Sequence, residues 1–291
     1  MSQRTKGVLC ILCSAFCFAS MNTFVRLSGD LPTIQKSFFR NFVALLFALI
    51  MLLRSGEKLR CSPKNLPLLL VRSAAGTFGI LGNFYAVDHM LLSDASLLNK
   101  LSPFFTILFS RIFLRERLTL FQGAAVCTAF AGALLIIKPG MDFAAVFPAL
   151  MGFLGGMGAG GAYTAVRALT QRGERGPFIV FFFSGFSCLV ALPSLILDYH
   201  PMSPYQLAML LLAGLSAAGG QFTITAAYSF APAREISVFD YTNVLFAALW
   251  GFLLFSQVPD GWSILGYGII TAVAVAMFFY NKRQDSAGTK T

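Results

Sequence analysis

The sequence contains ten apolar blocks of membrane-spanning length, and the last five repeat the first five. Shifting the sequence against itself by 141 positions, without a gap, aligns Thr23 with Thr164, Val25 with Val166, Arg26 with Arg167, Gly79 with Gly220, Ala86 with Ala227, Ser96 with Ser237, Phe105 with Phe246 and Leu108 with Leu249. Because each unit has an odd number of spans, the second unit must enter the membrane in the opposite direction. The sequence therefore predicts two inverted five-helix repeats, residues 1–140 and 141–291, divided at the Pro139-Gly140 turn.

The composition predicts an all-α membrane protein. Hydrophobic residues make up 57% of the chain and charged residues only 12%, which leaves too little polar surface for a water-soluble domain. Period-two alternation is absent, so helices rather than a barrel satisfy the backbone in lipid. The ten transmembrane helices are predicted at residues 7–28, 34–53, 66–88, 94–113, 119–137, 145–168, 178–199, 205–229, 235–256 and 261–281.

Lys and Arg gather in alternate connections, which predicts the orientation. Basic clusters precede the first span and follow the second, fourth, sixth and tenth spans, whereas the opposite connections carry Asp30, Asp88, Asp94, Asp142, Asp198 and Asp260. Lys36 and Lys138 are the only basic residues that we place outside the membrane on that acidic side. The positive-inside rule puts both termini in the cytoplasm, and the compact chain favours a bacterial inner membrane. Cytoplasmic loops also explain the net charge of +10, so no nucleic-acid partner is implied.

Four ionisable residues within or at the end of the apolar spans are candidates for function: Arg40, Lys100, Glu116 and Asp240. Such groups are costly in a bilayer and usually face a cavity or a partner. The 141-residue offset brings Asn99 onto Asp240 and Lys100 onto Tyr241, so Lys100 and Asp240 occupy neighbouring symmetry-related positions. They are predicted either to bind the carboxylate and the ammonium of a zwitterionic solute or to neutralise each other as a structural ion pair. The two interpretations are compatible at different steps of a transport cycle.

Uncharged polar residues accompany these charges in the first, third, fourth, sixth, eighth and ninth spans. We expect these spans to line a cavity and the apolar fifth, seventh and tenth spans to face lipid. For any single polar side chain, an interhelical hydrogen bond is the alternative to solute contact. The candidate solute-binding residues are Asn22, Arg40, Asn83, Tyr85, Asn99, Lys100, Tyr163, Gln221, Thr225, Asp240 and Tyr241.

Proline and glycine indicate where helices bend and approach each other. Pro103 lies in the fourth span and removes a backbone hydrogen bond beside Asn99 and Lys100, which predicts a kink there. Val244 occupies the corresponding position of the ninth span, so we do not expect the two spans to play equal mechanical roles. Glycine stripes on the third and sixth spans, including Gly152, Gly156 and Gly160, predict close helix packing.

The chain resembles the EamA-type branch of the drug/metabolite transporter superfamily over most of its length. The resemblance lies in residues 38–42 (Phe-Phe-Arg-Asn-Phe), in Pro103-Phe104, and in residues 115–123, which read Arg-Glu-Arg-Leu-Thr-Leu-Phe-Gln-Gly. It implies a secondary carrier with a central cavity between the halves, for amino acids or other metabolites. Val244 and Gln257 replace Pro103 and Glu116 in the second half. Glu116, between two arginines, is expected to form a structural ion pair.

Other functional classes receive less support from the sequence. Two histidines and six dispersed cysteines make neither a metal site nor a disulfide framework, and no catalytic motif or cofactor-binding loop is present. A channel would normally repeat its pore lining around an axis along the membrane normal. We therefore expect a transporter without cofactor or metal, monomeric or homodimeric. An exporter of drugs or other organic cations, a channel and a membrane enzyme are the alternatives, and the solute, the direction and the coupling ion stay open.

Overall fold

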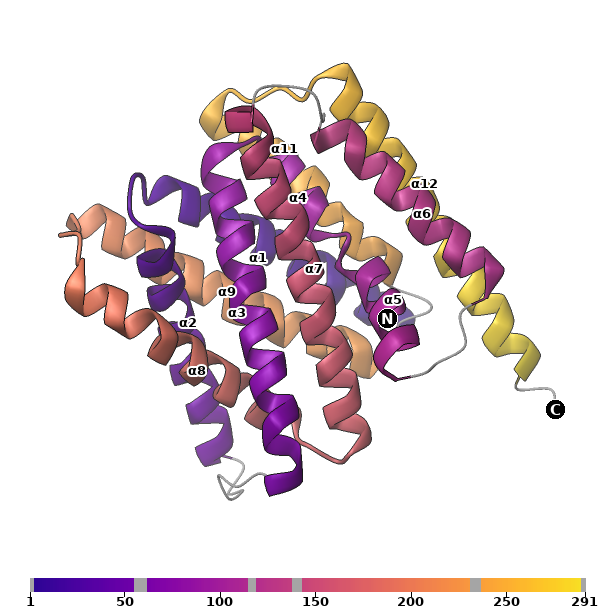
Figure 1. Cartoon of the computed structure of the whole chain (residues 1–291), viewed down its shortest axis with the longest axis horizontal. Helices are drawn as coiled ribbons and strands as arrows, with labels where there is room; N and C mark the ends of the chain where they lie inside the picture. The colour runs from indigo at the N-terminus through magenta and orange to yellow at the C-terminus, as the bar shows by residue number, and fades with distance from the viewer. Residues whose placement is uncertain (1–2, 55–61, 115–118, 138–142, 231–236, 289–291) are drawn as a thin grey trace.

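The computed structural model describes residues 3–54, 62–114, 119–137, 143–230 and 237–288, which form helices joined by short connections (Figure 1). Glu116, Lys138 and the Pro139-Gly140 boundary fall outside these ranges. The helices are α1 (Gln3–Leu27), α2 (Thr33–Arg54), η1 (Pro63–Asn65), α3 (Leu66–His89), α4 (Leu92–Asn99), α5 (Ser102–Phe113), α6 (Leu120–Ile137), α7 (Phe143–Gln171), α8 (Gly176–Leu197), α9 (Pro204–Phe230), η2 (Ser237–Tyr241), α11 (Thr242–Phe255) and α12 (Gly261–Gly288).

The architecture is that of a multi-pass membrane protein. Within the described ranges, seven helices are long and apolar enough to cross a bilayer, namely α1, α2, α3, α6, α8, α9 and α12. The 29-residue helix α7 covers the sixth predicted span. The fourth and ninth predicted spans are each divided into two shorter helices. No strand occurs among the described residues, and the all-helical prediction is confirmed for them.

The fourth span is interrupted at Lys100 and Leu101, between α4 and α5. Pro103 lies in the first turn of α5 and cannot donate a hydrogen bond to the carbonyl group of Asn99 four residues earlier. A new helix therefore starts here, as the position of Pro103 predicted. The ninth span changes from the 3-10 helix η2 to the α-helix α11 directly after Tyr241, although Val244 replaces the proline.

Contacts within the protein explain this change of helix type. The Tyr241 hydroxyl donates a hydrogen bond to the Lys100 carbonyl oxygen across 3.1 Å, and the Thr242 hydroxyl donates one to the Phe239 carbonyl oxygen across 2.6 Å. Both side chains thus donate hydrogen bonds to backbone carbonyl groups. These bonds stabilise the short 3-10 turn, although the ninth span has no proline that corresponds to Pro103. The expectation that the two spans play unequal mechanical roles stays a prediction.

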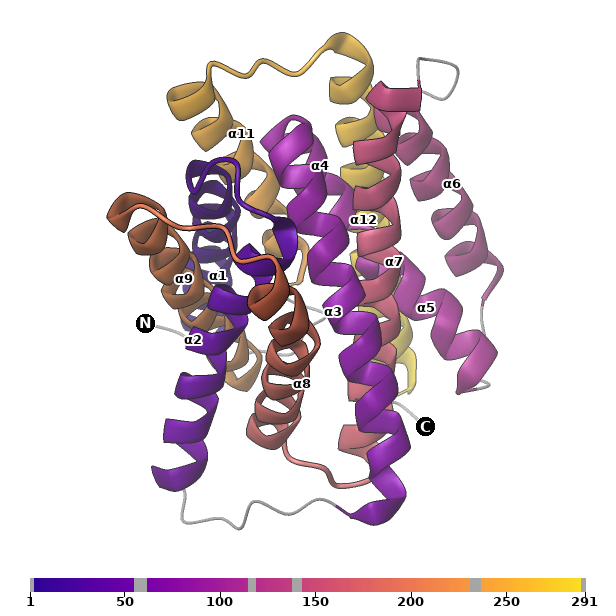
Figure 2. The same cartoon turned by 60° about the vertical axis from the view of Figure 1, so that its left-hand side comes forward.

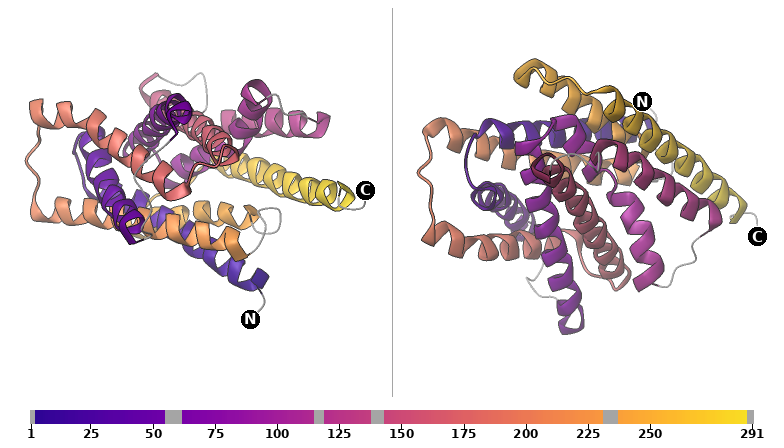
Figure 3. Two further views of the ribbon diagram at one scale, coloured as in Figure 1. Left: turned by 90° about the horizontal axis from the view of Figure 1, so that it is seen from below. Right: turned by 45° about the horizontal axis from the view of Figure 1, so that its top comes forward.

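The helices pack as two bundles and two flanking pairs. We call α1, α9, η2 and α11 the first bundle, in which α1 packs against α9 and α11. The second bundle contains α3, α4, α5 and α7, with α7 packed against the other three. Helix α2 pairs with α8, and α6 runs beside α12 at one edge of the molecule (Figures 1 and 2). From below, α2 and α8 lie on the side away from the C-terminal part of α12 (Figure 3).

Glycines permit the closest helix contacts in the second bundle. A Cβ atom placed on Gly82 would lie 2.6 Å from the Met151 carbonyl oxygen, and one on Gly156 would lie 2.5 Å from the Leu98 carbonyl oxygen. Both distances are shorter than a side-chain carbon can tolerate next to backbone. The glycine stripes therefore bring α7 into direct backbone contact with α3 and α4, as the sequence predicted.

The connections gather at two opposite ends. At the acidic end, which contains residues 28–32, 90–91, 198–203 and 256–260, Gln206 donates to the Ser28 carbonyl oxygen, and Gln257 accepts a hydrogen bond from the Leu92 backbone. At the basic end, which contains η1 and residues 172–175, Asn65 donates to the Glu174 carboxylate across 3.0 Å. The grouping of connections agrees with the predicted sidedness, whereas the orientation in the membrane stays a prediction.

Single-cysteine labelling tests that orientation. In a variant without the native cysteines, a cysteine at the exposed position Ser203, at the acidic end, should react with a membrane-impermeant maleimide applied to intact cells. One at the exposed position Gln171, at the basic end, should react only after the cells are opened. The reverse pattern would contradict the orientation.

Candidate functional site

A central cavity of about 160 Å³ lies between the two bundles. The first bundle lines it from α1, α9, η2 and α11, and the second bundle lines it from α3, α4 and α7. Eight of the predicted candidates line this cavity: Asn22, Arg40, Asn83, Asn99, Lys100, Tyr163, Gln221 and Asp240. The sequence therefore identified most of the polar cavity wall, and the role of these residues in solute binding stays a prediction.

An ion pair joins the two bundles inside this cavity. The Lys100 Nζ atom lies 2.5 Å from the Asp240 Oδ2 atom, and the two side chains are 13% and 21% exposed. Lys100 caps the C-terminus of α4, and Asp240 belongs to η2, so each charge lies where its span departs from a continuous α-helix. The second carboxylate oxygen, Oδ1, is buried without a hydrogen-bond partner. The pair thus retains an unused acceptor beside the cavity.

Amide side chains extend the polar wall between α1, α3 and α4. Asn83 donates to the Asn22 Oδ1 atom across 3.2 Å, and Asn22 donates to the Ser96 hydroxyl across 3.4 Å. The Asn83 Oδ1 atom is buried without a partner. On the other side, Asn243 donates to the Ala15 carbonyl oxygen across 2.9 Å and fixes the start of α11 against α1. Sequence reasoning did not single out Ser96 or Asn243 as cavity residues.

Arg72 is the most important cavity residue that sequence reasoning missed. It lies in the first third of α3 and was not among the candidates predicted from the sequence. A signal was present, because Arg72, Gly76, Gly79 and Asn83 follow one another at helical spacings of four, three and four. All four residues line the cavity. The polar stripe of α3 therefore extends about three turns further toward the basic end than predicted.

Three predicted candidates have other placements. Tyr85 does not line the cavity; its ring stacks on His89, with the centroids 4.1 Å apart, and packs edge-on against Phe147. Two residues after Asn83, its side chain projects from a different face of α3. Tyr241 lies beneath the cavity wall, where its hydroxyl binds the Lys100 carbonyl group. The side chain of Thr225 is outside the described part of the chain.

The seventh predicted span, α8, is not purely lipid-facing. Phe183 is 6% exposed and lines the cavity, and Phe178 is 5% exposed in a core with Leu69 and Leu169. Leu197, near the other end of α8, is 85% exposed. An apolar helix can pack on protein with one face and on lipid with the other, so composition alone could not distinguish these surfaces.

The central cavity adjoins a second cavity of about 500 Å³ that reaches toward the basic end. Arg72, Tyr163 and Gln221 line both cavities. The second cavity continues along α2, α8 and α9 to Met51 and to Gly176, near the basic-end termini of α2 and α8. This arrangement gives the central polar residues a path toward one end of the molecule.

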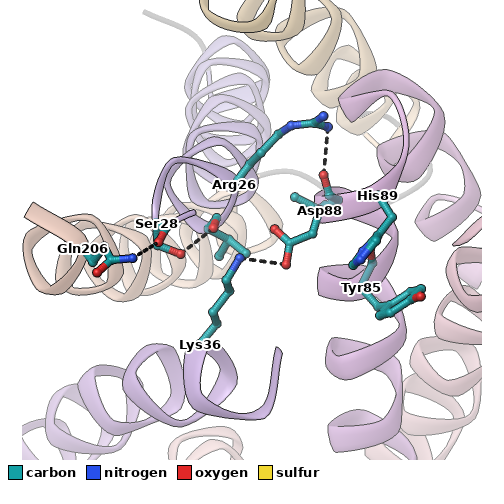
Figure 4. A network of polar contacts seen from close by, with 9 residues as sticks. Arg26, Ser28, Lys36, Tyr85, Asp88, His89 and Gln206 are labelled. Carbon is teal, nitrogen blue, oxygen red and sulfur yellow. Dashed lines mark hydrogen bonds and ion pairs between the residues drawn. The ribbon is translucent and has the colours of Figure 1, made fainter. Parts of the chain in front are cut away.

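At the acidic end, a cavity of about 570 Å³ shares no lining residue with the central cavity, and Arg26, Lys36 and Asp88 form a network of contacts in its wall (Figure 4). The Lys36 Nζ atom lies 2.8 Å from the Asp88 Oδ2 atom, which ties the start of α2 to the end of α3. Arg26, near the end of α1, donates to the Val87 carbonyl oxygen across 2.9 Å. The Lys36 side chain is 1% exposed. Lys36 therefore turns inward to pair with Asp88, and its placement outside the membrane stays a prediction.

Comparison with known proteins agrees with this architecture. The sequence profile of the EamA-like transporter family matches residues 5–138. The pseudopaline exporter CntI of Pseudomonas aeruginosa is 35% identical over 273 residues, which cover 93% of this chain and 95% of the relative. The chain belongs to the EamA-like transporter family.

Other members of the drug/metabolite transporter superfamily match over similar lengths. The riboflavin transporter of Brucella anthropi is 27% identical over 96% of this chain and 98% of its own. Human solute carrier family 35 member G1 is 26% identical over 89% of this chain and 75% of its own. A solved structure entitled "Crystal structure of protein" has a TM-score of 0.66 at 15% identity, covers 95% of this chain and 98% of its own, and shows the shared fold.

These matches identify the chain as a membrane transporter of the EamA-like family and not as a member of an enzyme family. Within the described ranges, no group of three or more His, Cys, Asp or Glu side chains is arranged to hold a metal ion. The charged and amide groups around the cavity can instead bind a solute through hydrogen bonds and ion pairs.

The ion pair at the acidic end gives a testable stability effect. Asp88→Asn should destabilise the protein by about 3 kcal/mol, because it leaves the buried Lys36 ammonium without a counter-charge. Replacing both partners, Lys36→Met with Asp88→Leu, should restore most of the lost stability. Thermal unfolding in detergent measures both effects. A double variant no more stable than Asp88→Asn would contradict the role of the ion pair.

Proposed function

We propose that this protein carries a small zwitterionic metabolite, such as an amino acid or a related solute, across the membrane by alternating access. The observation that carries the proposal is the ion pair between Lys100 and Asp240, which lies in a cavity between two bundles, where two apolar spans depart from a continuous α-helix. Interrupted helices place charged side chains and free backbone groups at a site within membrane depth. The two bundles provide the surfaces that would move.

The helix contacts support the inverted repeat of residues 1–140 and 141–291. Under the 141-residue offset, α1 corresponds to α7, α2 to α8, α3 to α9, and α4 with α5 to η2 with α11. If the two halves are related by symmetry, the contact of α1 with α9 should have a counterpart between α7 and α3. The contact of α2 with α9 should likewise have a counterpart between α8 and α3. All four contacts are present. Gly79 packs α3 on α7, and its counterpart Gly220 packs α9 on α1. These exchanges favour a two-fold relation between the bundles.

The ion pair suits a zwitterionic solute. A charge buried alone in a bilayer is costly, so Lys100 and Asp240 neutralise each other while the cavity is empty. The carboxylate of the solute would take the place of Asp240 as the partner of Lys100. The ammonium group of the solute would take the place of Lys100 as the partner of Asp240. Both charges then stay compensated during binding. The structural and solute-binding interpretations of the pair therefore describe two steps of one cycle.

The cavities favour solute entry from the basic end. The cavity at the acidic end, lined by Arg26, Lys36 and Asp88, shares no lining residue with the central cavity, whereas the second cavity adjoins the central one and extends toward the basic end. The positive-inside rule places that end, and both termini, on the cytoplasmic side of an inner membrane. This direction agrees with the name of CntI, which is an exporter.

Counterflow in proteoliposomes tests the proposal. Vesicles preloaded with a mixture of unlabelled amino acids should take up labelled amino acids faster than empty vesicles, because a carrier exchanges solute across the membrane. Lys100→Ala should reduce this uptake by about tenfold or more, since it removes a charge-assisted contact. Lys64→Ala, which changes an exposed lysine at the basic end, is the matched control and should transport at the parental rate.

The double variant Lys100→Ala with Asp240→Ala separates the two interpretations of the ion pair. It removes both charges of the pair and leaves neither partner uncompensated, so a purely structural pair would allow normal transport once both partners are gone. We expect transport to stay lost while the protein remains folded by size-exclusion chromatography. Uptake at the parental rate in the double variant would overturn the proposed site.

A further inference from the structure

Two arginines line the central cavity without a compensating carboxylate. Arg40 on α2 is 7% exposed, and its Nε atom donates no hydrogen bond. Arg72 on α3 has buried Nε and Nη1 atoms that also donate none. Neither arginine forms an ion pair with a residue that the structure describes. Unused guanidinium donors in such a site are costly and indicate a binding role.

Both guanidinium groups are held in place by neighbouring residues. The Arg72 guanidinium carbon lies 3.7 Å from the centroid of the Phe183 ring. On another side, a Cβ atom placed on Gly76 would lie 2.7 Å from the Arg72 Nη1 atom, so only glycine leaves room for this position. Phe183 and Gly76 thus define a slot for the guanidinium group. A planar group in such a slot keeps its donor edge free for an anion.

Arg40 is fixed by a short chain of hydrogen bonds on α2. Its Nη1 atom donates to the Asn41 Oδ1 atom across 2.8 Å. The Asn41 amide group in turn donates to the Ser37 carbonyl oxygen across 2.9 Å and lies 3.1 Å from the Ser37 hydroxyl. One edge of the Arg40 guanidinium is therefore engaged by the protein, while its Nε atom stays available at the cavity.

The formal charges around the cavity do not cancel. Among the described lining residues, Arg40, Arg72 and Lys100 each contribute one positive charge, and Asp240 contributes the single negative charge. A zwitterionic solute adds no net charge and leaves two positive charges uncompensated. A solute with further carboxylates would compensate them, and a guanidinium group binds a carboxylate with two parallel hydrogen bonds. The same excess disfavours an organic cation.

We propose that Arg40 and Arg72 form a carboxylate subsite beside the ion pair of Lys100 and Asp240. The preferred solute is then an amino acid with one or two additional carboxylates and a net negative charge. This inference rests on the proposed function, because Lys100 and Asp240 bind the amino acid end of the same solute. Arg40 and Arg72 bind the additional carboxylates and select for charge.

A matched series of amino acids tests the subsite. L-2-Aminobutyrate, L-glutamate and L-γ-carboxyglutamate share the same amino acid end and carry one, two and three carboxylates. We expect binding to the purified wild-type protein, measured by calorimetry in low-chloride buffer, to tighten by about tenfold for each added carboxylate. Glutarate, which has two carboxylates and no ammonium group, should bind more weakly than L-glutamate because it leaves Asp240 unused.

Arginine variants assign the charge selectivity to the subsite. Arg72→Gln and Arg40→Gln should each weaken L-γ-carboxyglutamate binding by about tenfold and leave L-2-aminobutyrate binding unchanged. Arg54→Gln changes an exposed arginine of α2 at the basic end and should alter neither. Arg72→Gln should also unfold at the same temperature as the wild type or a higher one, because it removes an uncompensated buried charge. A lower unfolding temperature with equal loss of all solutes would show a structural role and overturn the subsite.

The remaining outcomes separate the two proposals. Equal affinity for the three amino acids, with binding lost in Lys100→Ala, would overturn the carboxylate subsite and leave the proposed function intact. Unchanged binding of all three in Lys100→Ala would overturn the amino acid site. Absence of binding by any of the three amino acids would contradict both proposals.

Discussion

A bilayer requires every backbone N–H and C=O group at membrane depth to have a partner within the protein. Two spans of this chain depart from a continuous α-helix, at Lys100–Leu101 and at Tyr241. The surrounding helices are arranged so that they cover these two positions. Tyr241 binds the Lys100 carbonyl group, so the second position satisfies a backbone group of the first. The packed glycines of α7 bring backbone next to the first break. A polar cavity is the consequence, because irregular backbone at this depth is tolerated only inside protein or beside water.

The sequence predicted the helices and most of the polar wall because the signals were local. Apolar length identified the spans, Pro103 identified one interruption, and charge in an apolar segment identified Lys100 and Asp240. Tertiary contacts determined the rest. No local sequence signal marks the change of helix type at Tyr241. One of the hydrogen bonds that stabilise it joins residues 141 positions apart, and the other lies within the 3-10 turn. Lys36 looked like a loop residue because its partner Asp88 is 52 positions away.

Arg72 and Tyr85 show why residue type alone could not define the site. Both lie on α3, and both are polar or charged near a span end. Only the angular position on the helix separates them: Arg72 shares the face of Asn83, whereas Tyr85 projects elsewhere and stacks on His89. The comparisons establish the family, and the described geometry adds an ion pair in the cavity, two unpaired guanidinium groups and a second ion pair at the acidic end. Together these features describe a carrier in which Lys100 and Asp240 neutralise each other in the empty cavity, while Arg40 and Arg72 have no carboxylate partner.

The central claim is that the two bundles move in opposite senses around the fixed site. Spin-label distances test it most directly, with one pair across the acidic end, at His89 of α3 and at Ser203 directly before α9, and one pair across the basic end, at Gln3 of α1 and Gln171 of α7. Removing the ion pair of Lys36 and Asp88 with Asp88→Asn should lengthen the distance at the acidic end and shorten the distance at the basic end. Lengthening at the acidic end without any change at the basic end would contradict alternating access.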